Sequence, residues 1–421
     1  MATDDLVVGL DIGSTKVCAV IGERNENGTL EITGVGMSPS SGLRRGVVVN
    51  IEATLRAVAA AVEAAEMMSG REVHSCWTGI GGNHIDGINS RGVVAVTGKT
   101  RETREIGKDD LNRVLEAARA VVIPMDRQVL EVIPQSYIVD DQKFIRDPLD
   151  MIGVRLEAEV HIITCPVTSA QNLIKCVNRA GFKVNDLILQ SLAAGRAVLT
   201  EEEKELGCAL IDMGGGTTDV LVYSQGTPFS TTGVPVGGVR VTSDIAEVIH
   251  LPFETAERIK LDAGCCWEDL LEADEDIIVP GVGGRPPLPV PRSHIMRIIL
   301  LRMEEIFTLV KRKLESLPLT RPLGGGIVLT GGGALLLGAA ELATHVFKTP
   351  VRIGIPLSNS LGGLVDEYRN PAYAAAVGLV IEGNDRERGN APERGGSSYP
   401  QEKGPPSFFG RFTDWLRKEF F

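Results

Sequence analysis

Two stretches of the sequence repeat a pattern that could hold phosphate: an apolar run, an aspartate, a short turn rich in glycine and hydroxyl residues, and a second apolar run. They occupy residues 7–20 and 208–222. Glycines let the backbone adopt positive φ and bring N–H groups close to an anion. One such turn is usually only a turn. Its repetition about two hundred residues later indicates a duplicated domain that grips one nucleotide between its halves.

Polar residues beside these turns suggest further chemistry. Asp212 closes the apolar run before the glycine triplet, where its carboxylate could hold a hydrated Mg²⁺ beside the phosphates. Gln190 lies between a predicted strand and a predicted helix, and its amide could position a water molecule near a γ-phosphate. A buried structural glutamine is an equally good interpretation.

Candidates for contacting ribose and adenine lie farther along the chain. Glu257 and Lys260 are three residues apart on one predicted helix, so they share a face and could hold ribose hydroxyls. An exposed ion pair is the ordinary alternative. The glycine turn at 331–333 follows a strand and precedes a helix, so adenine could lie against its backbone. Gly237 and Gly238 form another glycine turn.

The elements that would position these residues alternate between strands and helices, which is typical of an α/β fold. A small-residue helix at 371–382 could pair with one at 191–205 as a hinge between the halves. Further strands are predicted at 30–36, 75–81 and 184–190, and further helices at 51–68, 165–180, 239–249, 253–263 and 293–316.

Residues 83–163 differ in character, with many charges and several short strand-like runs, and we expect an inserted α+β subdomain there. Its clearest helix is predicted at 108–121, with Asp109 as the candidate N-cap. Residues 279–291 are rich in glycine and proline, which predicts a turn-rich connector.

Length and composition limit the possible functions. With 421 residues, 43% of them hydrophobic, the chain is long enough for more than one domain. A formal net charge of −12 argues against a nucleic-acid partner, because such proteins usually carry a basic field. The seven cysteines show no paired spacing, so reduced structural thiols are expected. We find no signal peptide and no apolar run of membrane-spanning length, so any membrane attachment would be peripheral.

The last part of the sequence combines a polar stretch with an aromatic end. Residues 383–407 are rich in Gly, Pro, Ser, Asn, Arg and Glu, which predicts a disordered linker. Residues 408–421 place bulky apolar side chains within an arc of roughly 140° on a helical wheel, which favours a helix lying in a lipid interface over one docked on protein. These side chains are Phe408, Phe409, Phe412, Trp415, Leu416 and Phe420.

The order of these motifs resembles that of the actin, heat-shock chaperone and sugar-kinase superfamily. Within it, the stretches 132–140, 153–157 and 160–164, together with the tethered end, resemble the FtsA family of bacterial cell-division proteins. The resemblance implies an α/β, actin-like bilobed fold, with ATP and Mg²⁺ between two duplicated nucleotide-binding halves. It also implies an inserted α+β subdomain that supports self-assembly into filaments and contacts with later division proteins, and a C-terminal amphipathic helix.

The resemblance also assigns roles to individual residues. Asp11 would join Asp212 in organising the metal, and Gln190 stands where chaperone relatives have a glutamate, so at most weak ATPase activity is expected. The candidate cofactor-binding residues are Gly13, Ser14, Thr15, Lys16, Gly214, Gly215, Gly216 and Thr217 for phosphates, Glu257 and Lys260 for ribose, Gly331, Gly332 and Gly333 for adenine, and Gly237 and Gly238.

In the family, the subdomain that carries the basic helix binds the acidic C-terminal tail of FtsZ, which makes Arg292, Arg297 and Arg302 candidates here. Basic residues on an acidic protein could dock an acidic peptide, although a solvated helix face is the default interpretation.

We expect the chain to be divided into the following domains: 1–82 and 164–190 for the first lobe, with 370–382 packing back on it; 83–163 for the inserted subdomain; 191–230 and 317–369 for the second lobe; 231–316 for its outer subdomain; 383–407 for the linker; and 408–421 for the membrane-targeting helix.

The function expected from these features is that of an ATP-binding, actin-like cell-division protein. It would polymerise at the cytoplasmic face of the inner membrane at the division site, anchor FtsZ filaments to an anionic membrane surface and recruit later division proteins. ATP would act mainly as a conformational ligand. Two alternatives share the nucleotide cradle: a phosphotransferase of the same superfamily acting on a small metabolite, and a pilus-type actin-like adaptor.

Overall fold

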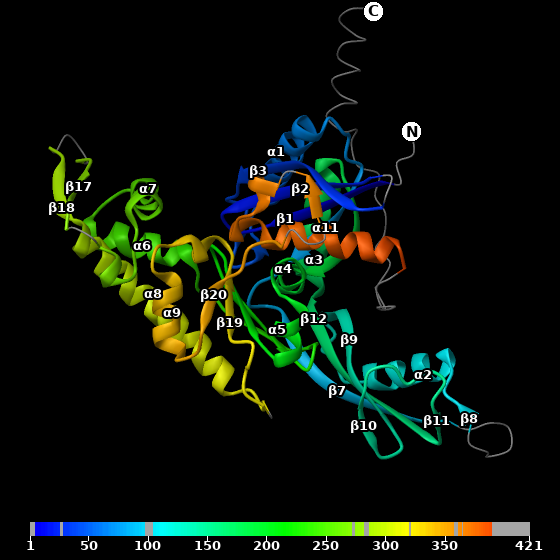
Figure 1. The fold of residues 1–421 in the computed structure, drawn as a ribbon. Coiled ribbons are helices and arrows are strands. Elements are labelled where there is room, and N and C mark those ends of the chain that lie inside the picture. The colour runs from blue at the N-terminus through cyan, green and yellow to red at the C-terminus, as the bar shows by residue number, and fades with distance from the viewer. Residues whose placement is uncertain are drawn as a thin grey trace, which may run out of the picture.

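The computed structural model describes residues 5–25, 28–96, 104–271, 274–281, 286–319, 321–357, 361–363 and 365–389. Two mixed sheets, each flanked by helices, form two lobes, and a third sheet forms a subdomain that projects from them at the lower right of Figure 1. The bilobed α/β architecture and the inserted α+β subdomain are therefore confirmed.

The first sheet has the strand order β13-β6-β1-β2-β3-β21. Residues 361–363 and 365–368 belong to this lobe and not to the second lobe, where we expected them, because β21 pairs with β3, and Leu361 and Tyr368 are buried in the first core. The short helix α10 (Val365–Tyr368) follows β21. The strands are β1 (Leu6–Ile12), β2 (Lys16–Arg24), β3 (Leu30–Pro39), β6 (Ser75–Ile80), β13 (Lys183–Leu189) and β21 (Leu361–Gly363).

Helices cover both faces of the first sheet. On one face lies α1 (Ile51–Ser69), with α3 (Val167–Ala180) packed against it, and on the other lies α11 (Ala374–Glu387). The sequence of α1 explains its ends: the Asn50 side chain accepts a hydrogen bond from the Ala53 N–H at 3.0 Å, and Gly70 ends the helix in the left-handed region.

The helices α11 and α4 (Gln190–Val198) cross in close contact at the centre of the molecule (Figure 1). A Cβ atom at Gly378 would lie 1.7 Å from the carbonyl oxygen of Ala193, so only glycine permits this approach. The predicted pairing of the two small-residue helices is confirmed.

The helix predicted at 191–205 is two helices, α4 and α5 (Glu201–Leu206). Leu199 is extended, and Thr200 begins α5 with a capping box. The Thr200 hydroxyl accepts a hydrogen bond from the Glu203 N–H at 3.2 Å, and the Thr200 N–H donates to Glu203 Oε2 at 2.9 Å. The chain breaks here because these hydrogen bonds stabilise a new helix start.

The second sheet repeats the pattern of the first. Strand β14 is antiparallel to β15 and parallel to β19, as β1 is to β2 and β6, and so the duplicated halves are confirmed. The strand order is β16-β15-β14-β19-β20. The strands are β14 (Ala209–Met213), β15 (Thr218–Ser224), β16 (Thr227–Val234), β19 (Ile327–Thr330) and β20 (Val351–Ile353).

The outer part of the second lobe contains a hairpin where we predicted only a turn-rich connector at 279–291. The strands β17 (Asp276–Val279) and β18 (Leu288–Pro291) pair because Val279 and Val290 are buried in the second core, and prolines are tolerated in edge strands. The helices of this lobe are α6 (Gly238–Ile249), α7 (Phe253–Ala263), α8 (Arg292–Glu315) and α9 (Ala339–Phe347).

The inserted subdomain is a sheet in the order β10-β9-β12-β7 with α2 (Lys108–Arg119) packed on it. Asp109 is exposed and is not the cap of α2. The N-cap is Gly107, whose N–H donates to the buried Asp110 at 3.0 Å, because Asp110 is the residue placed to reach back to it. The strands are β7 (Asp86–Ala95), β9 (Arg127–Val139), β10 (Gln142–Ile145), β12 (Arg155–Pro166) and the small pair β8 (Arg104–Glu105) and β11 (Ile152–Gly153).

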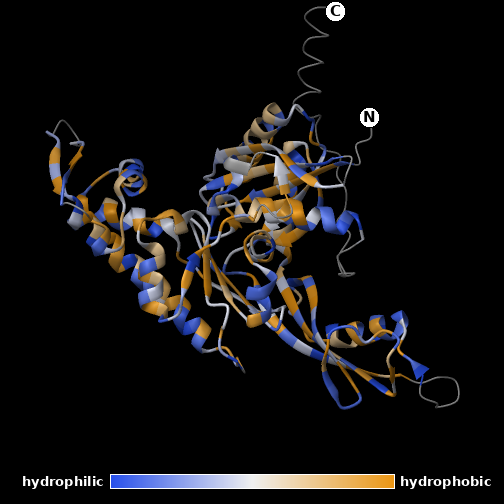
Figure 2. Cartoon of the chain, in the orientation of Figure 1, coloured by the Kyte–Doolittle hydropathy of each residue, from blue (hydrophilic) through white to orange (hydrophobic). Residues whose placement is uncertain are grey.

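Three apolar cores hold these parts together, one in each lobe and one in the inserted subdomain. Figure 2 shows hydrophobic residues concentrated where α4 and α11 cross, whereas the outer helices are mixed. All seven cysteines are buried and free, as expected for reduced structural thiols. None of the helices in the described ranges is long and apolar enough to cross a membrane.

The last described helix runs farther than predicted. Residues 383–387 were assigned to a disordered linker, but they continue α11, because Asp385, Arg386 and Glu387 make ion pairs with residues of α4, the inserted subdomain and β2. Residues 390–407 of the predicted linker and the predicted amphipathic helix at 408–421 lie outside the described residues.

Candidate functional site

The two predicted phosphate turns have the same geometry and face one cavity. In each turn the first glycine donates a backbone hydrogen bond across the turn, from Gly13 to the Lys16 carbonyl at 2.9 Å and from Gly214 to the Thr217 carbonyl at 3.0 Å. Both turns line a cavity of about 70 Å³ between the lobes. Its other lining includes Asp11, Gln190, Asp212, Gly331, Gly332 and Ala372.

Three carboxylates lie at this cavity: Asp11, which is buried, and Asp212 and Asp219, which are half-buried. Burial raises the pKa of Asp11, against the opposing effect of the Lys16 charge. Burial, followed by the nearby charges of Asp219 and Asp11, raises the pKa of Asp212 to about 7. Burial raises the pKa of Asp219 to about 6, against hydrogen bonds from the Thr217 hydroxyl and the Gly82 N–H. A cation in the cavity would stabilise the charged forms of these carboxylates, because a nearby positive charge lowers the pKa of a carboxyl group.

Sequence reasoning missed Asp219. It is the cross-strand partner of Asp212, and the corresponding partner of Asp11 in the first half is Cys18. A comparison of the two halves therefore does not identify Asp219, because the repeated pattern has no aspartate at the corresponding position of the first half. The signal that could have found it was its position directly after two threonines in the second turn.

Within the described ranges, no three His, Cys, Asp or Glu side chains converge as direct ligands of a metal ion. Asp11 and Asp212 nevertheless line the same cavity. Carboxylates fit Mg²⁺, which keeps several of its water ligands and needs only one or two protein oxygens. The chemistry of this pair is therefore compatible with Mg²⁺ held largely through water.

Lys16 and Gln190 connect the first turn to the helices. The Lys16 ammonium donates to the carbonyl oxygen of Ala372, just before α11. The Gln190 amide nitrogen donates to Asp11 Oδ1 at 2.5 Å and to the Ile12 carbonyl at 3.4 Å. Gln190 therefore orients a candidate metal carboxylate from the first turn of α4.

A second cavity, of about 510 Å³, continues from the phosphate turns into the second lobe. It shares Thr15, Lys16 and the turn at 214–215 with the first cavity. The ribose and adenine candidates Glu257, Lys260, Gly238, Gly332 and Gly333 line it. The structure thus brings the predicted phosphate, ribose and adenine residues to one continuous cleft.

The side chains of Glu257 and Lys260 also pair with each other. Lys260 Nζ lies 2.8 Å from Glu257 Oε2 and 2.9 Å from the Thr242 hydroxyl. Glu257 and Lys260 therefore form the ion pair of the ordinary interpretation, and they also line the cavity where the functional interpretation places ribose.

Gly331 closes the cleft beside Asp212. Its φ of +82° lies in the left-handed region, and a Cβ atom there would be 2.3 Å from Asp212 Oδ1. Its N–H donates to the Pro371 carbonyl at 3.2 Å, in the turn η5 (Pro371–Tyr373). Glycine is therefore required at this junction.

The three arginines proposed for a partner peptide do not share a surface. Arg292 lines the 510 Å³ cavity and donates to the Ala263 carbonyl at 3.2 Å. Arg302 is held by Asp244 and borders a different cavity. Arg297 is exposed and lines a groove of about 750 Å³ with Trp267, Met296 and Leu300. The three candidates therefore line three separate cavities.

The chain is similar to one protein family along its length. The family model "Cell division protein FtsA" matches residues 209–378, and the model "SHS2 domain inserted in FTSA" matches residues 82–164. The cell division protein FtsA of Borreliella burgdorferi is 45% identical over 99% of both chains, and that of Pseudomonas aeruginosa is 44% identical over 99% of this chain and 98% of its own. That of Escherichia coli K12 is 39% identical over 100% of this chain and 99% of its own.

Solved structures with low sequence identity share the fold. The PilM-PilN type IV pilus biogenesis complex has a TM-score of 0.63 at 17% identity, covering 90% of this chain and 98% of that chain. MreB5 of Spiroplasma citri bound to ADP has a TM-score of 0.53 at 16% identity, covering 91% and 95%. These likenesses support an actin-like fold.

Proposed function

Since the chain belongs to the FtsA family of cell division proteins, we propose that it binds Mg·ATP between its lobes and uses the nucleotide as a conformational ligand. The observation that carries this proposal is the pair of matching turns, 13–16 and 214–217, which face one cavity from opposite halves of the molecule. A ligand held by both turns would bind best when the lobes are closed.

In this proposal each part of the cleft binds one part of the nucleotide. The turn residues and Lys16 hold phosphates, Glu257 and Lys260 hold ribose hydroxyls, and the glycine turn at 331–333 flanks adenine. Asp11 and Asp212 hold Mg²⁺ through water, and the cation would supply charge neutralisation at the phosphates. The ADP and AMPPNP bound by fold relatives support this arrangement.

Hydrolysis would be weak. The Gln190 amide nitrogen already donates to Asp11, and an amide cannot accept a proton as a general base does. Its role would be to orient Asp11 and, at most, one water molecule.

We further propose that the groove around Arg297 binds the acidic C-terminal tail of FtsZ. The groove combines an exposed guanidinium with the apolar surfaces of Trp267, Met296 and Leu300, and a peptide with acidic and apolar residues would match both. Three carboxylates, those of Glu268, Asp269 and Asp274, also line it, so a basic residue of the peptide could pair there.

The remaining parts of the proposal concern assembly. Filaments would form from ATP-bound copies, with the inserted subdomain available to them and to later division proteins. The aromatic end, residues 408–421, would lie in the anionic cytoplasmic face of the membrane at the division site. One short helix binds lipid weakly, so several copies in a filament would be needed for stable attachment.

Co-sedimentation with anionic vesicles tests this proposal with the full chain, a chain lacking 408–421, and a labelled FtsZ tail peptide. We expect ATP-dependent pelleting that the deletion abolishes, and peptide recruitment that Arg297→Glu reduces by about tenfold. Arg312→Glu, at an exposed position of α8 outside the groove, is the matched control. Equal peptide binding by both variants would contradict the role of the groove in binding the FtsZ tail. Pelleting of the chain that lacks residues 408–421 would contradict the role of these residues in membrane binding.

The two alternative functions, a phosphotransferase of the same superfamily and a pilus-type actin-like adaptor, have less support. Relatives that are 39–45% identical over nearly the whole chain are cell division proteins. The pilus complex shares only 17% sequence identity with this chain, so the similarity indicates a shared fold but not a shared function.

A further inference from the structure

A cavity of about 400 Å³ lies directly beside the nucleotide cleft. It borders both phosphate turns, because Ser14, Gly215 and Gly216 line it as well as the cleft. We call it the arginine pocket, after its four charged lining residues. These are Arg44, Arg45, Arg240 and Arg302, and none of the described residues that line the pocket is acidic. In a chain with a net charge of −12, this is a local concentration of positive charge.

Two of the arginines are fixed in place by carboxylates. They project from the neighbouring helices α6 and α8 and share Asp244, which lies 3.4 Å from Arg240 Nε and 3.2 Å from Arg302 Nη2. Glu247 and Glu305 make further pairs with them. These ion pairs position two guanidinium groups at the pocket and offset part of their charge.

The other two arginines have no such partners. Arg44 and Arg45 are exposed, and among the described residues their side chains make no hydrogen bond and no ion pair. Their charge at the pocket is therefore uncompensated by the protein, and guanidinium groups bind tetrahedral oxyanions through paired N–H donors.

The backbone at Arg45 gives an independent reason to regard its side chain as functional. Strands β4 (Leu43–Arg44) and β5 (Val47–Val48) are joined by a two-residue turn in which Arg45 and Gly46 both have positive φ, 53° and 82°. Such turns favour asparagine or aspartate before glycine. An arginine here is conformationally unfavourable, yet among the described residues its side chain makes no hydrogen bond and no ion pair that would offset the cost.

The hairpin is also tied to the nucleotide cleft. The Gly46 N–H approaches the Ser14 hydroxyl at 3.4 Å, and Ser14 belongs to the first phosphate turn. The first N–H groups of α6 are already bonded to the second turn, from Gly238 to the Gly214 carbonyl at 3.0 Å and from Val239 to the Gly215 carbonyl at 2.9 Å. An anion in the pocket would therefore be held by the arginines and not by the helix N-terminus.

We propose that the arginine pocket binds inorganic phosphate at a site separate from the nucleotide phosphates. The site goes beyond nucleotide binding, and phosphate binding there does not require the nucleotide proposal to be correct. Phosphate in this position would lie beside both turns, since Ser14 and the turn at 215–216 border both cavities.

Calorimetric titration of the full chain with sodium phosphate at constant ionic strength tests the inference, without nucleotide and with a saturating non-hydrolysable ATP analogue. We expect millimolar binding under both conditions. Arg45→Asn and Arg44→Gln should each weaken it by about tenfold, because each removes charge-assisted hydrogen bonds. Arg56→Gln, at an exposed position on α1 away from the pocket, should bind as the wild type does.

Arg45→Asn also separates function from folding. Asparagine suits the left-handed conformation better than arginine, so this variant should melt at or above the wild-type temperature while losing phosphate. Unchanged phosphate affinity in both pocket variants would overturn the inference, and so would complete displacement of phosphate by the ATP analogue, which would place phosphate between the turns. If the analogue itself does not bind, the nucleotide proposal fails, and the titration without nucleotide still decides the phosphate site.

Discussion

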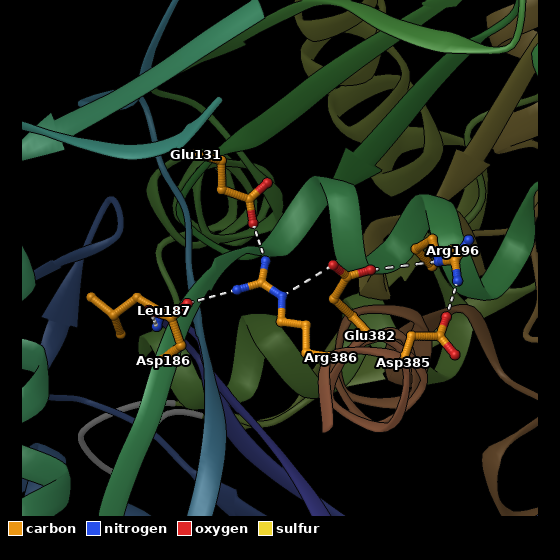
Figure 3. Close-up of polar contacts among 7 residues, drawn as sticks. All are labelled: Glu131, Asp186, Leu187, Arg196, Glu382, Asp385 and Arg386. Carbon is orange, nitrogen blue, oxygen red and sulfur yellow. Dashed lines mark hydrogen bonds and ion pairs between the residues drawn. The ribbon is translucent and has the colours of Figure 1, made fainter. Parts of the chain in front are cut away.

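Arg386, on the last described helix, donates a hydrogen bond of 2.5 Å to Glu131, on the longest strand of the inserted subdomain (Figure 3). The same guanidinium donates to Asp186 on β13 at 2.6 Å and to Glu382 on α11 at 3.2 Å. Glu131 is 1% exposed and Arg386 lies 5.7 Å from the Trp77 ring. One side chain thus joins the inserted subdomain, the first sheet and α11, whose other end begins at the candidate nucleotide cleft.

Arg386→Met tests this junction. Removing the guanidinium takes one charge partner from each of the buried carboxylates Glu131 and Glu382, although Glu382 keeps its ion pair with Arg196. Breaking a buried pair costs about 3–5 kcal/mol. We expect a loss of about 3 kcal/mol in the free energy of unfolding, measured by urea denaturation. Arg179→Gln breaks only an exposed pair with Glu52 and should change it by less than about 1 kcal/mol. Equal effects of the two variants would contradict the buried role of Arg386.

His161 predicts a dependence of stability on pH. Its ring bridges the inserted subdomain to the second lobe, with Nδ1 2.6 Å from Asn89 and Nε2 2.9 Å from Thr231 on β16. Burial lowers the pKa of His161 from 6.5 to about 4. Because the unfolded chain takes up the proton more readily, the stabilisation is complete above pH 6.5 and is lost as the pH falls from 6.5 towards 4.

The measurement is the difference between wild type and His161→Gln in unfolding free energy at several pH values. The wild type should lose up to about 1.4 kcal/mol per pH unit relative to the variant between pH 6 and about 4.5. Comparing with the variant removes the contributions of His84, whose pKa is also lowered by burial, and of Asp212 and Asp219, whose raised pKa values act in the opposite direction. Parallel curves for the two proteins would show that His161 is not buried as described.

Much of the fold can be predicted from the pattern of apolar residues in the sequence, but the break between α4 and α5 and the hairpin β17–β18 cannot. The split between α4 and α5 depends on the capping box of Thr200 and Glu203, which competes with an otherwise continuous helical pattern. The hairpin β17–β18 lies in a stretch whose glycines and prolines predict turns, and it forms because Val279 and Val290 reach the second core. Tertiary burial of this kind is invisible in local sequence.

The candidate site was predictable where the two halves repeat and not where they differ. The phosphate turns could be aligned with each other, whereas Asp219 has Cys18 as its counterpart. The candidates Arg292, Arg297 and Arg302 line separate cavities for a geometric reason. At five-residue spacing each side chain is rotated by about 140° from the previous one, so the three leave the helix in different directions. That separation could have been foreseen from the sequence.

The crossing of α4 and α11 predicts that Gly378 cannot be replaced. Gly378→Ala would place a methyl group 1.7 Å from the Ala193 carbonyl oxygen, which forces the helices apart. We expect a loss of about 3 kcal/mol or slightly more in unfolding free energy, at the upper end of the usual cost of overpacking. Gly332→Ala, where no atom lies within 4 Å of the added methyl, should leave the stability of the nucleotide-free protein within about 0.5 kcal/mol of wild type. Unfolding midpoints in urea would show whether the two variants differ in this way.

The most direct test of the proposed clamp is the affinity of Asp212→Asn for Mg·ATP, measured by titration with a fluorescent ATP analogue. Burial already penalises the charged form of Asp212 and raises its pKa to about 7, so the neutral amide should leave the melting temperature of the nucleotide-free protein unchanged or higher. We predict that the dissociation constant for Mg·ATP rises by at least about tenfold, since the carboxylate proposed to hold Mg²⁺ is lost. Wild-type affinity for Mg·ATP in this well-folded variant would contradict the assignment of the cleft.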